Sequence, residues 1–291
     1  MSGDTAGSQT ARLSLVGVGA TALLGVLLFA GYRAGEQKVL AVSAVAFLAM
    51  AGFAVPGARA AGTQNARRLV WGYGLAAGAM VTSASLFLLP QAFALGRESG
   101  GVLGPKAGGV GVALGLLAAY GGHTIGHRLS HVDAAFDSAA AQITAHSLSA
   151  GLVIGTIYAA LPTVGYLLGL SIVSHKGPAG YAAARRLRKA NKPVSVLLLP
   201  AAGIGLTAIP VALLDPTFAA QTKAVIFGFG AGVFLHVAMD FLPECETGTE
   251  VGEVAALSEN AHALLDRLRV HAVASTSAGA LAVFGAWLVV T

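Results

Sequence analysis

Hydrophobic residues form nine long segments of the chain, each close to the roughly 20 residues that cross a bilayer as a helix. Few polar residues interrupt these segments, as expected where lipid or other helices surround the backbone. The segments cover residues 12–32, 38–56, 68–95, 105–127, 140–163, 165–184, 194–214, 221–243 and 268–290. We therefore predict an all-α fold, a polytopic membrane helix bundle.

The first segment stands apart from the other eight. Its apolar run from Leu13 to Ala30 follows a weakly charged start, as in a signal peptide, but it is longer than the usual hydrophobic region of one. The Gly/Ala-rich flanks leave cleavage open. We favour a retained helix and divide the chain into an extra N-terminal helix (1–37) and a transmembrane domain of eight helices (38–291).

Composition supports a membrane protein. Of the 291 residues, 55% are hydrophobic and 11% are charged, against roughly 25% charged in ordinary globular domains. The net charge of +5 comes from Lys and Arg in a few short stretches, which fits loop charge and requires no nucleic acid. The lipid bilayer is the expected partner and the cell membrane the expected location. The single cysteine, Cys245, excludes an intrachain disulfide.

Two basic clusters set the expected orientation. One contains Arg59, Arg67 and Arg68, and the other lies within residues 185–192. Four predicted helices separate them, so both fall on one side of the membrane, which we take to be the cytoplasm. The acidic segment 244–267 would then also face the cytoplasm, as a solvated linker.

Two internal repeats relate distant helices. The first matches residues 77–91, which end in Leu88-Leu89-Pro90-Gln91, with residues 230–244, which end in Asp240-Phe241-Leu242-Pro243-Glu244. Their helices are five apart and run in opposite directions, which is typical of inverted repeats in secondary transporters. Chance similarity among Gly/Ala/Leu-rich helices is the alternative.

The second repeat has the pattern H-x-x-x-A-G. It occurs at His146–Gly151 and at His175–Gly180, each within an apolar helix. Ionisable groups inside a bilayer are costly and tend to mark function. Neutral imidazole binds zinc and similar divalent metals, so His146 and His175 are candidate metal ligands.

Other oxygen ligands lie near the first histidine. A tetrahedral site needs about four ligands, and Ser147 and Ser149 could add oxygens to the two imidazoles. The alternative is a pair of core histidines that hydrogen-bond between helices.

These motifs resemble those of the ZIP (Zrt/Irt-like) divalent-metal transporters. That family has motifs like H-N-x-P-[DE]-G in its fourth helix and H-[NDE]-x-P-[EH]-[EG] in its fifth, and Leu-Pro-acid exits from its second and seventh. The matches here include His146, Gly151, His175, Pro178 and Gly180. The resemblance covers residues 38–290 and implies eight core helices with a metal site, often binuclear, between the fourth and fifth.

The expected carboxylates are missing from this chain. Substitutions relative to the family pattern are Ser147, Ala150, Lys176, Ala179, Gln91 and the helix-six sequence Thr207-Ala208-Ile209-Pro210. An ammonium close to a divalent cation repels it. We therefore expect Lys176 to occupy the space of the second metal, which leaves one ion at the histidines. Alternatively, burial makes Lys176 neutral, or Lys176 extends to an aqueous mouth.

Two further polar stripes have i, i+4, i+8 spacing. His123, His127 and His131 could form a cytoplasmic metal site, because an i, i+4 histidine pair can chelate a cation; a wet interfacial face is the alternative. His236, Asp240 and Glu244 could line a cation exit, with Asp240 inside the span; a structural role is the alternative.

The sequence thus predicts transport of a zinc-like divalent metal toward the cytoplasm, with Lys176 and Gln91 also in the pathway. Alternating access would move helices two and seven against the rest. The second hypothesis is a ZIP-derived membrane protein that senses metal or acts as a scaffold without transport, and an anion or small polar solute is a third cargo. Divalent metal ions are the expected partners, and a homodimer is possible. We expect neither a cofactor nor enzymatic activity, because the chain has no phosphate-binding loop, C-x-x-C or H-E-x-x-H motif.

Overall fold

The computed structural model describes residues 13–62, 65–129, 138–160, 166–173, 175–214, 217–246, 250–256 and 260–290. All regular elements within these ranges are helices. The α-helices are α1 (Leu15–Ala34), α2 (Gln37–Arg59), α3 (Ala66–Ser83), α4 (Leu89–Glu98), α5 (Lys106–Leu129), α6 (Ser138–Ala160), α7 (Tyr166–Val173), α8 (Lys176–Lys189), α9 (Leu198–Leu214), α10 (Ala220–Asp240), α11 (Glu250–Ala255) and α12 (Ala261–Val290). Short helical turns cover η1 (Ala60–Gly62), η2 (Ala84–Leu88) and η3 (Val194–Leu197).

The bundle is that of a membrane-embedded protein. Within the described ranges, six helical stretches are long and apolar enough to cross a bilayer: Leu15–Ala34, Gln37–Arg59, Ala66–Glu98, Val194–Leu214, Ala220–Asp240 and Ala261–Val289. The all-α prediction is confirmed. The count of eight core helices plus one stays a prediction.

The predicted segment 165–184 is not one continuous helix. α7 ends at Val173, and α8 begins at Lys176 and continues to Lys189. Pro178 lies in the first turn of α8, where its missing amide hydrogen costs no helical hydrogen bond. The proline therefore favours a new helix start at this place, just after His175.

The predicted segment 68–95 contains a wider turn. The chain passes from α3 through the π-helical turn Ala84–Leu88 into α4. Pro90 follows this turn and cannot donate a hydrogen bond to the preceding one. A π-turn accommodates such a break while the helix continues.

Glycines join eight helices into four close pairs, which are α2 with α8, α6 with α9, α3 with α12, and α5 with α10. In each pair a glycine lies directly against the partner's backbone, where a Cβ atom would collide. Examples are Gly180 on Met50, Gly151 on Ile204, Gly78 on Thr276 and Gly115 on Phe229. Small residues allow this approach in membrane bundles.

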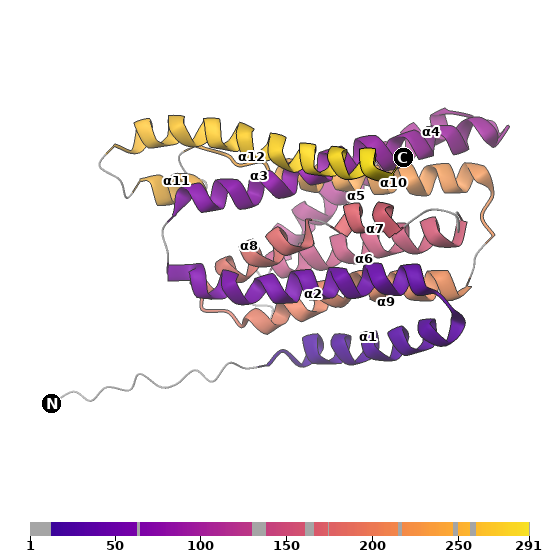
Figure 1. Ribbon diagram of the computed structural model, residues 1–291, viewed down its shortest axis with the longest axis horizontal. Helices are drawn as coiled ribbons and strands as arrows, with labels where there is room; N and C mark the ends of the chain where they lie inside the picture. Colours follow the sequence, from indigo (N-terminus) through magenta and orange to yellow (C-terminus); the bar gives the residue numbers. More distant parts are fainter. Residues whose placement is uncertain are drawn as a thin grey trace.

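The pairing has an internal symmetry. Exchanging α2 with α9, α3 with α10, α5 with α12 and α6 with α8 converts the four pairs into one another. α3 and α10 run in opposite directions in Figure 1, as do α2 and α9. This arrangement supports the inverted repeat inferred from the motifs of helices two and seven.

The helices α3 and α10 belong to the two helices that the sequence predicts to move against the rest, and each also packs closely on a further helix. Each is joined closely to another helix, α3 to α12 and α10 to α5. The predicted helix two also packs along α10 through all three of its parts, α3, η2 and α4, so the movement of helices two and seven against the rest stays a prediction. The natural division is between the group α2, α6, α8 and α9 and the group α3, α5, α10 and α12.

The helix α1 lies outside this symmetric set. It packs mainly along α9 and meets α2 through a tight turn at Gly35, whose φ of 87° suits glycine. At its start, the Ser14 amide donates to the Ser195 hydroxyl at 2.9 Å. Figure 1 shows α1 at the edge of the bundle.

The two basic clusters lie at the same end of the bundle, as predicted. Arg185 is buried, and its Nε donates to the Ala60 carbonyl at 3.4 Å, which joins α8 to the end of α2. Arg59 precedes this contact point directly.

The acidic segment after α10 is more ordered than a solvated linker. It contains α11, whose Val251, Val254 and Ala255 are buried together with Cys245. They pack with α3 and α12 residues, including Leu69. Burial of these apolar side chains explains why the acidic residues do not keep the segment extended.

Candidate metal site between α6 and α8

The two histidines of the H-x-x-x-A-G repeats meet in the structure. His146 lies in α6, and His175 immediately precedes α8. Their Nε2 atoms are 3.0 Å apart. The next residues also pair, because Lys176 Nζ donates to Ser147 Oγ at 2.6 Å. Equivalent positions of the two repeats are thus in direct contact.

The site is closed off from the surroundings. The exposed fraction is 8% for His146, 2% for His175, 1% for Lys176 and 0% for Ser147. Phe234 of α10 packs on both imidazoles, with ring centroids 5.6 Å from each. The pair therefore lies where the two helix groups meet.

A single hydrogen atom forms the hydrogen bond between the two imidazole rings. One Nε2 donates and the other accepts, so at least one ring is neutral at that atom. The Nδ1 atom of His146 is buried and has no hydrogen-bond partner among the described residues. This nitrogen is available to a ligand.

The geometry of the pair suits a shared cation. Two imidazole nitrogens bound to a tetrahedral zinc at roughly 2.0–2.1 Å are about 3.3 Å apart. The observed 3.0 Å separation needs to widen by only a few tenths of an ångström. A metal ion could thus replace the shared hydrogen, with both Nε2 atoms as ligands.

The protein supplies few other ligands. Within the part of the chain that the structure describes, no three His, Cys, Asp or Glu side chains form a cluster that could hold a metal. Ala150 and Ala179, which replace the carboxylates of the resembled motifs, are buried at 2% and 4% exposure. The described residues thus offer no further His, Cys, Asp or Glu ligand to an ion at the histidine pair.

The two predicted serine ligands are engaged elsewhere. Ser147 accepts the hydrogen bond from Lys176. Ser149 is half-buried and donates to the Ala145 carbonyl of its own helix at 2.9 Å. A hydroxyl held by the preceding turn is a common arrangement in helices. Neither serine oxygen contacts the histidine pair.

Lys176 does not extend to an aqueous mouth. It is one of the largest fully buried side chains of the protein, and Ser147 holds its ammonium group. The alternative of a solvated lysine is therefore wrong. The lysine lies beside the histidines, where the prediction placed a fixed positive charge.

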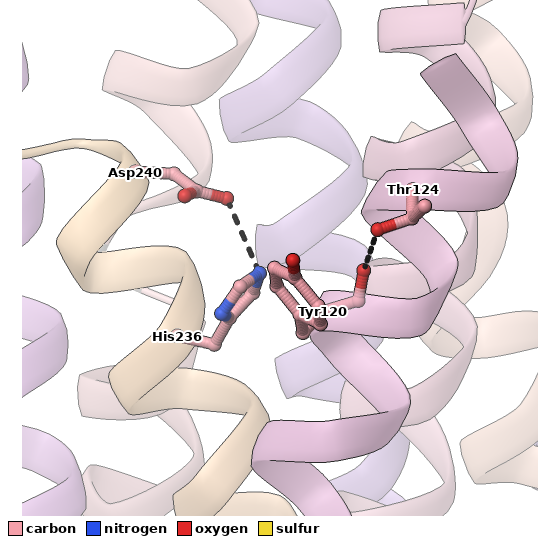
Figure 2. A network of polar contacts seen from close by, with 4 residues as sticks. All are labelled: Tyr120, Thr124, His236 and Asp240. Atoms are coloured by element: carbon pink, nitrogen blue, oxygen red, sulfur yellow. Dashed lines mark hydrogen bonds and ion pairs between the residues drawn. The ribbon is translucent and has the colours of Figure 1, made fainter. Parts of the chain in front are cut away.

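The predicted exit stripe is only partly assembled (Figure 2). His236 Nε2 lies 3.7 Å from Asp240 Oδ2, and the Tyr120 ring meets the His236 ring edge-on at 6.4 Å. Thr124 donates to the Tyr120 carbonyl at 3.0 Å. Among these contacts, the one between the Tyr120 and His236 rings joins α10 to α5.

Asp240 was predicted inside a span, and it is the terminal residue of the candidate span Ala220–Asp240. It is the last residue of α10, and its side chain is 43% exposed. Glu244 lies beyond the helix and is also exposed. The helix α10 ends at Asp240, before Pro243, whereas the sequence predicted that this segment continues to residue 243.

The remaining predicted residues are not joined to the site. Gln91 is half-buried in the first turn of α4. His131 lies outside the described residues, as do the side chains of His123 and His127 in α5. The proposed cytoplasmic histidine site is therefore untested.

Sequence reasoning missed Phe234 and the Lys176–Ser147 bond. An aromatic residue in an apolar helix has no pattern that separates it from core. The bond had a signal, because Ser147 and Lys176 are equivalent positions of repeats whose histidines were expected to meet.

No protein-family model matches the chain, and no curated protein is significantly similar to it. The resemblance to ZIP transporters therefore depends on the quoted motifs alone.

Proposed function

We propose that this chain carries a divalent, zinc-like metal ion across a membrane, with His146 and His175 as its protein ligands. The supporting observation is the 3.0 Å contact between two buried Nε2 atoms. Neutral imidazole is a preferred ligand of such metals. Ionisable groups inside a bilayer are costly and tend to mark function.

The arrangement of helices supports a carrier. His146 belongs to α6, His175 precedes α8, and Phe234 of α10 closes the site from the other helix group. The inverted repeat relates helices within each group, and a site between two such groups can open to either side in turn. The direction we propose is toward the cytoplasm, through the end of α10 that carries His236 and Asp240.

Metal binding tests the ligands directly. Zinc binding is measured on purified protein for wild type, for the double variant His146→Gln/His175→Gln and for His262→Gln, which removes an exposed histidine of α12. We expect the double variant to lose the proposed zinc site and His262→Gln to retain it. Equal affinity in all three proteins would exclude the histidine pair as the site.

A second function has its own support. Buried alanines replace both expected carboxylates, and two imidazoles alone make a weak site. A membrane protein that senses metal or acts as a scaffold needs binding but no passage. Histidine-dependent zinc binding without zinc flux into vesicles would favour this second function.

A further inference from the structure

The amino group of Lys176 is buried inside the bundle. Its exposed fraction is 1%, and Ser147 is its one hydrogen-bond partner among the described residues. No carboxylate in those ranges pairs with it. An ammonium has three donors, so two remain for other acceptors. Buried charges are normally paired, because removing them from water is costly.

The start of α8 adds positive potential at the same place. Lys176 is the first residue of this 14-residue helix, and the preceding His175 makes no side-chain capping bond. The first amide groups of a helix and its dipole attract anions. The buried lysine and the helix start thus favour the same kind of ligand independently.

The cation site also lacks negative charge. His146 and His175 are neutral ligands when they bind a metal, and the adjacent positions hold Ala150 and Ala179. A divalent ion added here would meet the charge of Lys176 at low dielectric without compensation. It would also have only two of about four ligands.

We propose that Lys176 and the start of α8 bind a small monovalent anion such as chloride, and that this anion completes the coordination of the metal at His146 and His175. The inference depends on the proposed metal site. The anion neutralises the lysine, supplies a metal ligand beyond the two histidines and reduces the repulsion between lysine and metal. Metal and anion would therefore bind cooperatively.

Cobalt(II) provides the probe, because its visible absorption reports the ligands around it. Full-length protein in detergent is titrated with cobalt in chloride and in an equal concentration of methanesulfonate. We expect wild type to bind cobalt about tenfold more tightly in chloride, within the usual range of coupling between two ligands. The spectrum should change as chloride enters the coordination shell.

Three variants locate the anion. Lys176→Met removes the amino group and its charge. Lys176→Gln removes the charge but keeps a polar group, so the test can still be made if just one of the two variants folds. Both should bind cobalt with no dependence on chloride. Lys106→Met, which removes an exposed lysine at the start of α5, should behave as wild type.

The outcomes separate the two proposals. The anion site would be excluded if wild type binds cobalt equally well with and without chloride. It would also be excluded if the Lys176 variants depend on chloride as much as wild type does. Either result would leave the histidine site unaffected. An absence of histidine-dependent cobalt binding in either salt would overturn both.

Discussion

His146 and His175, together with Ser147 and Lys176, occupy equivalent positions of a repeated motif. The two histidines are hydrogen-bonded to each other, and so are the serine and the lysine. A cation at the histidines would displace the first hydrogen bond and lie near the ammonium of the second pair. The charge of Lys176 would therefore control how strongly the proposed site binds metal.

Replacing Lys176 with aspartate reverses that charge. Lys176→Asp should raise the affinity for zinc by at least about tenfold, because repulsion is replaced by attraction at low dielectric. Equilibrium zinc binding measures the change, with Lys106→Asp at an exposed position as the control. Unchanged or weaker affinity in a folded Lys176→Asp protein would show that the lysine does not act on the metal.

Much of the contact between the two H-x-x-x-A-G repeats could be predicted from the sequence. The repeat identified both histidines, and the departure at Lys176 indicated a fixed charge beside them. The hydrogen bond from Ser149 to its own helix could not be predicted, because a serine at this spacing can donate to the preceding turn or face the histidine. Burial of Lys176 depended on how α8 packs, which no local pattern shows.

At the scale of elements, glycines determine how closely helices pack. Gly115 of α5 lies against the Phe229 backbone of α10, whereas Gly109 of the same helix has open space around its Cα. The two positions form a matched pair. A methyl group at the first must push two helices apart, and at the second it meets nothing.

Gly115→Ala should therefore destabilise the bundle by about 1–3 kcal/mol, the usual cost of overpacking. Gly109→Ala should be neutral, or should stabilise α5 by up to ~1 kcal/mol through helix propensity. Thermal unfolding in detergent compares them. Equal melting temperatures for the two variants would contradict the close contact between α5 and α10.

The segment between α10 and α12 forms a second, smaller core. Cys245 is 4% exposed and packs with α11, and burial raises the pKa of its thiol, although Arg269 partly opposes this. Less thiolate is then present at neutral pH, and the thiolate is the reactive form. Exposed Glu246 is adjacent in sequence and offers a comparison site.

Maleimide should label Cys245 more slowly at pH 7 than it labels the cysteine of a Cys245→Ser/Glu246→Cys protein. Because the pKa of Cys245 is raised, its labelling rate should continue to increase at pH values where the exposed cysteine is fully ionised. The rates are followed by mass spectrometry. Labelling of both cysteines at one rate would mean that the segment is open in solution.

Hydrophobic pattern predicted the helical elements well, but it could not locate breaks. The nine apolar segments correspond to helices, yet Pro178 and Pro90 introduced a new helix start and a π-turn inside two of them. α11 was missed because its apolar residues are few and lie among acidic ones. Their burial depends on α3 and α12, which are distant in sequence.

At the scale of the whole molecule, two groups of four helices face each other across the histidine site. Each group contains two glycine-mediated pairs, and the inverted repeat relates the two pairs within a group. The sequence indicated this symmetry through the helix-two and helix-seven motifs. The division into groups required the contacts themselves, since pairing between distant helices has no local signature.

Flux of zinc into proteoliposomes tests the central claim most directly. Wild type is compared with His146→Ala/His175→Ala and with His262→Ala, each shown to be folded and equally reconstituted. A carrier that binds its ion at the histidine pair predicts zinc entry with wild type and His262→Ala, and entry at the level of empty vesicles with the double variant. Equal flux in the double variant, or no flux with wild type, would contradict it.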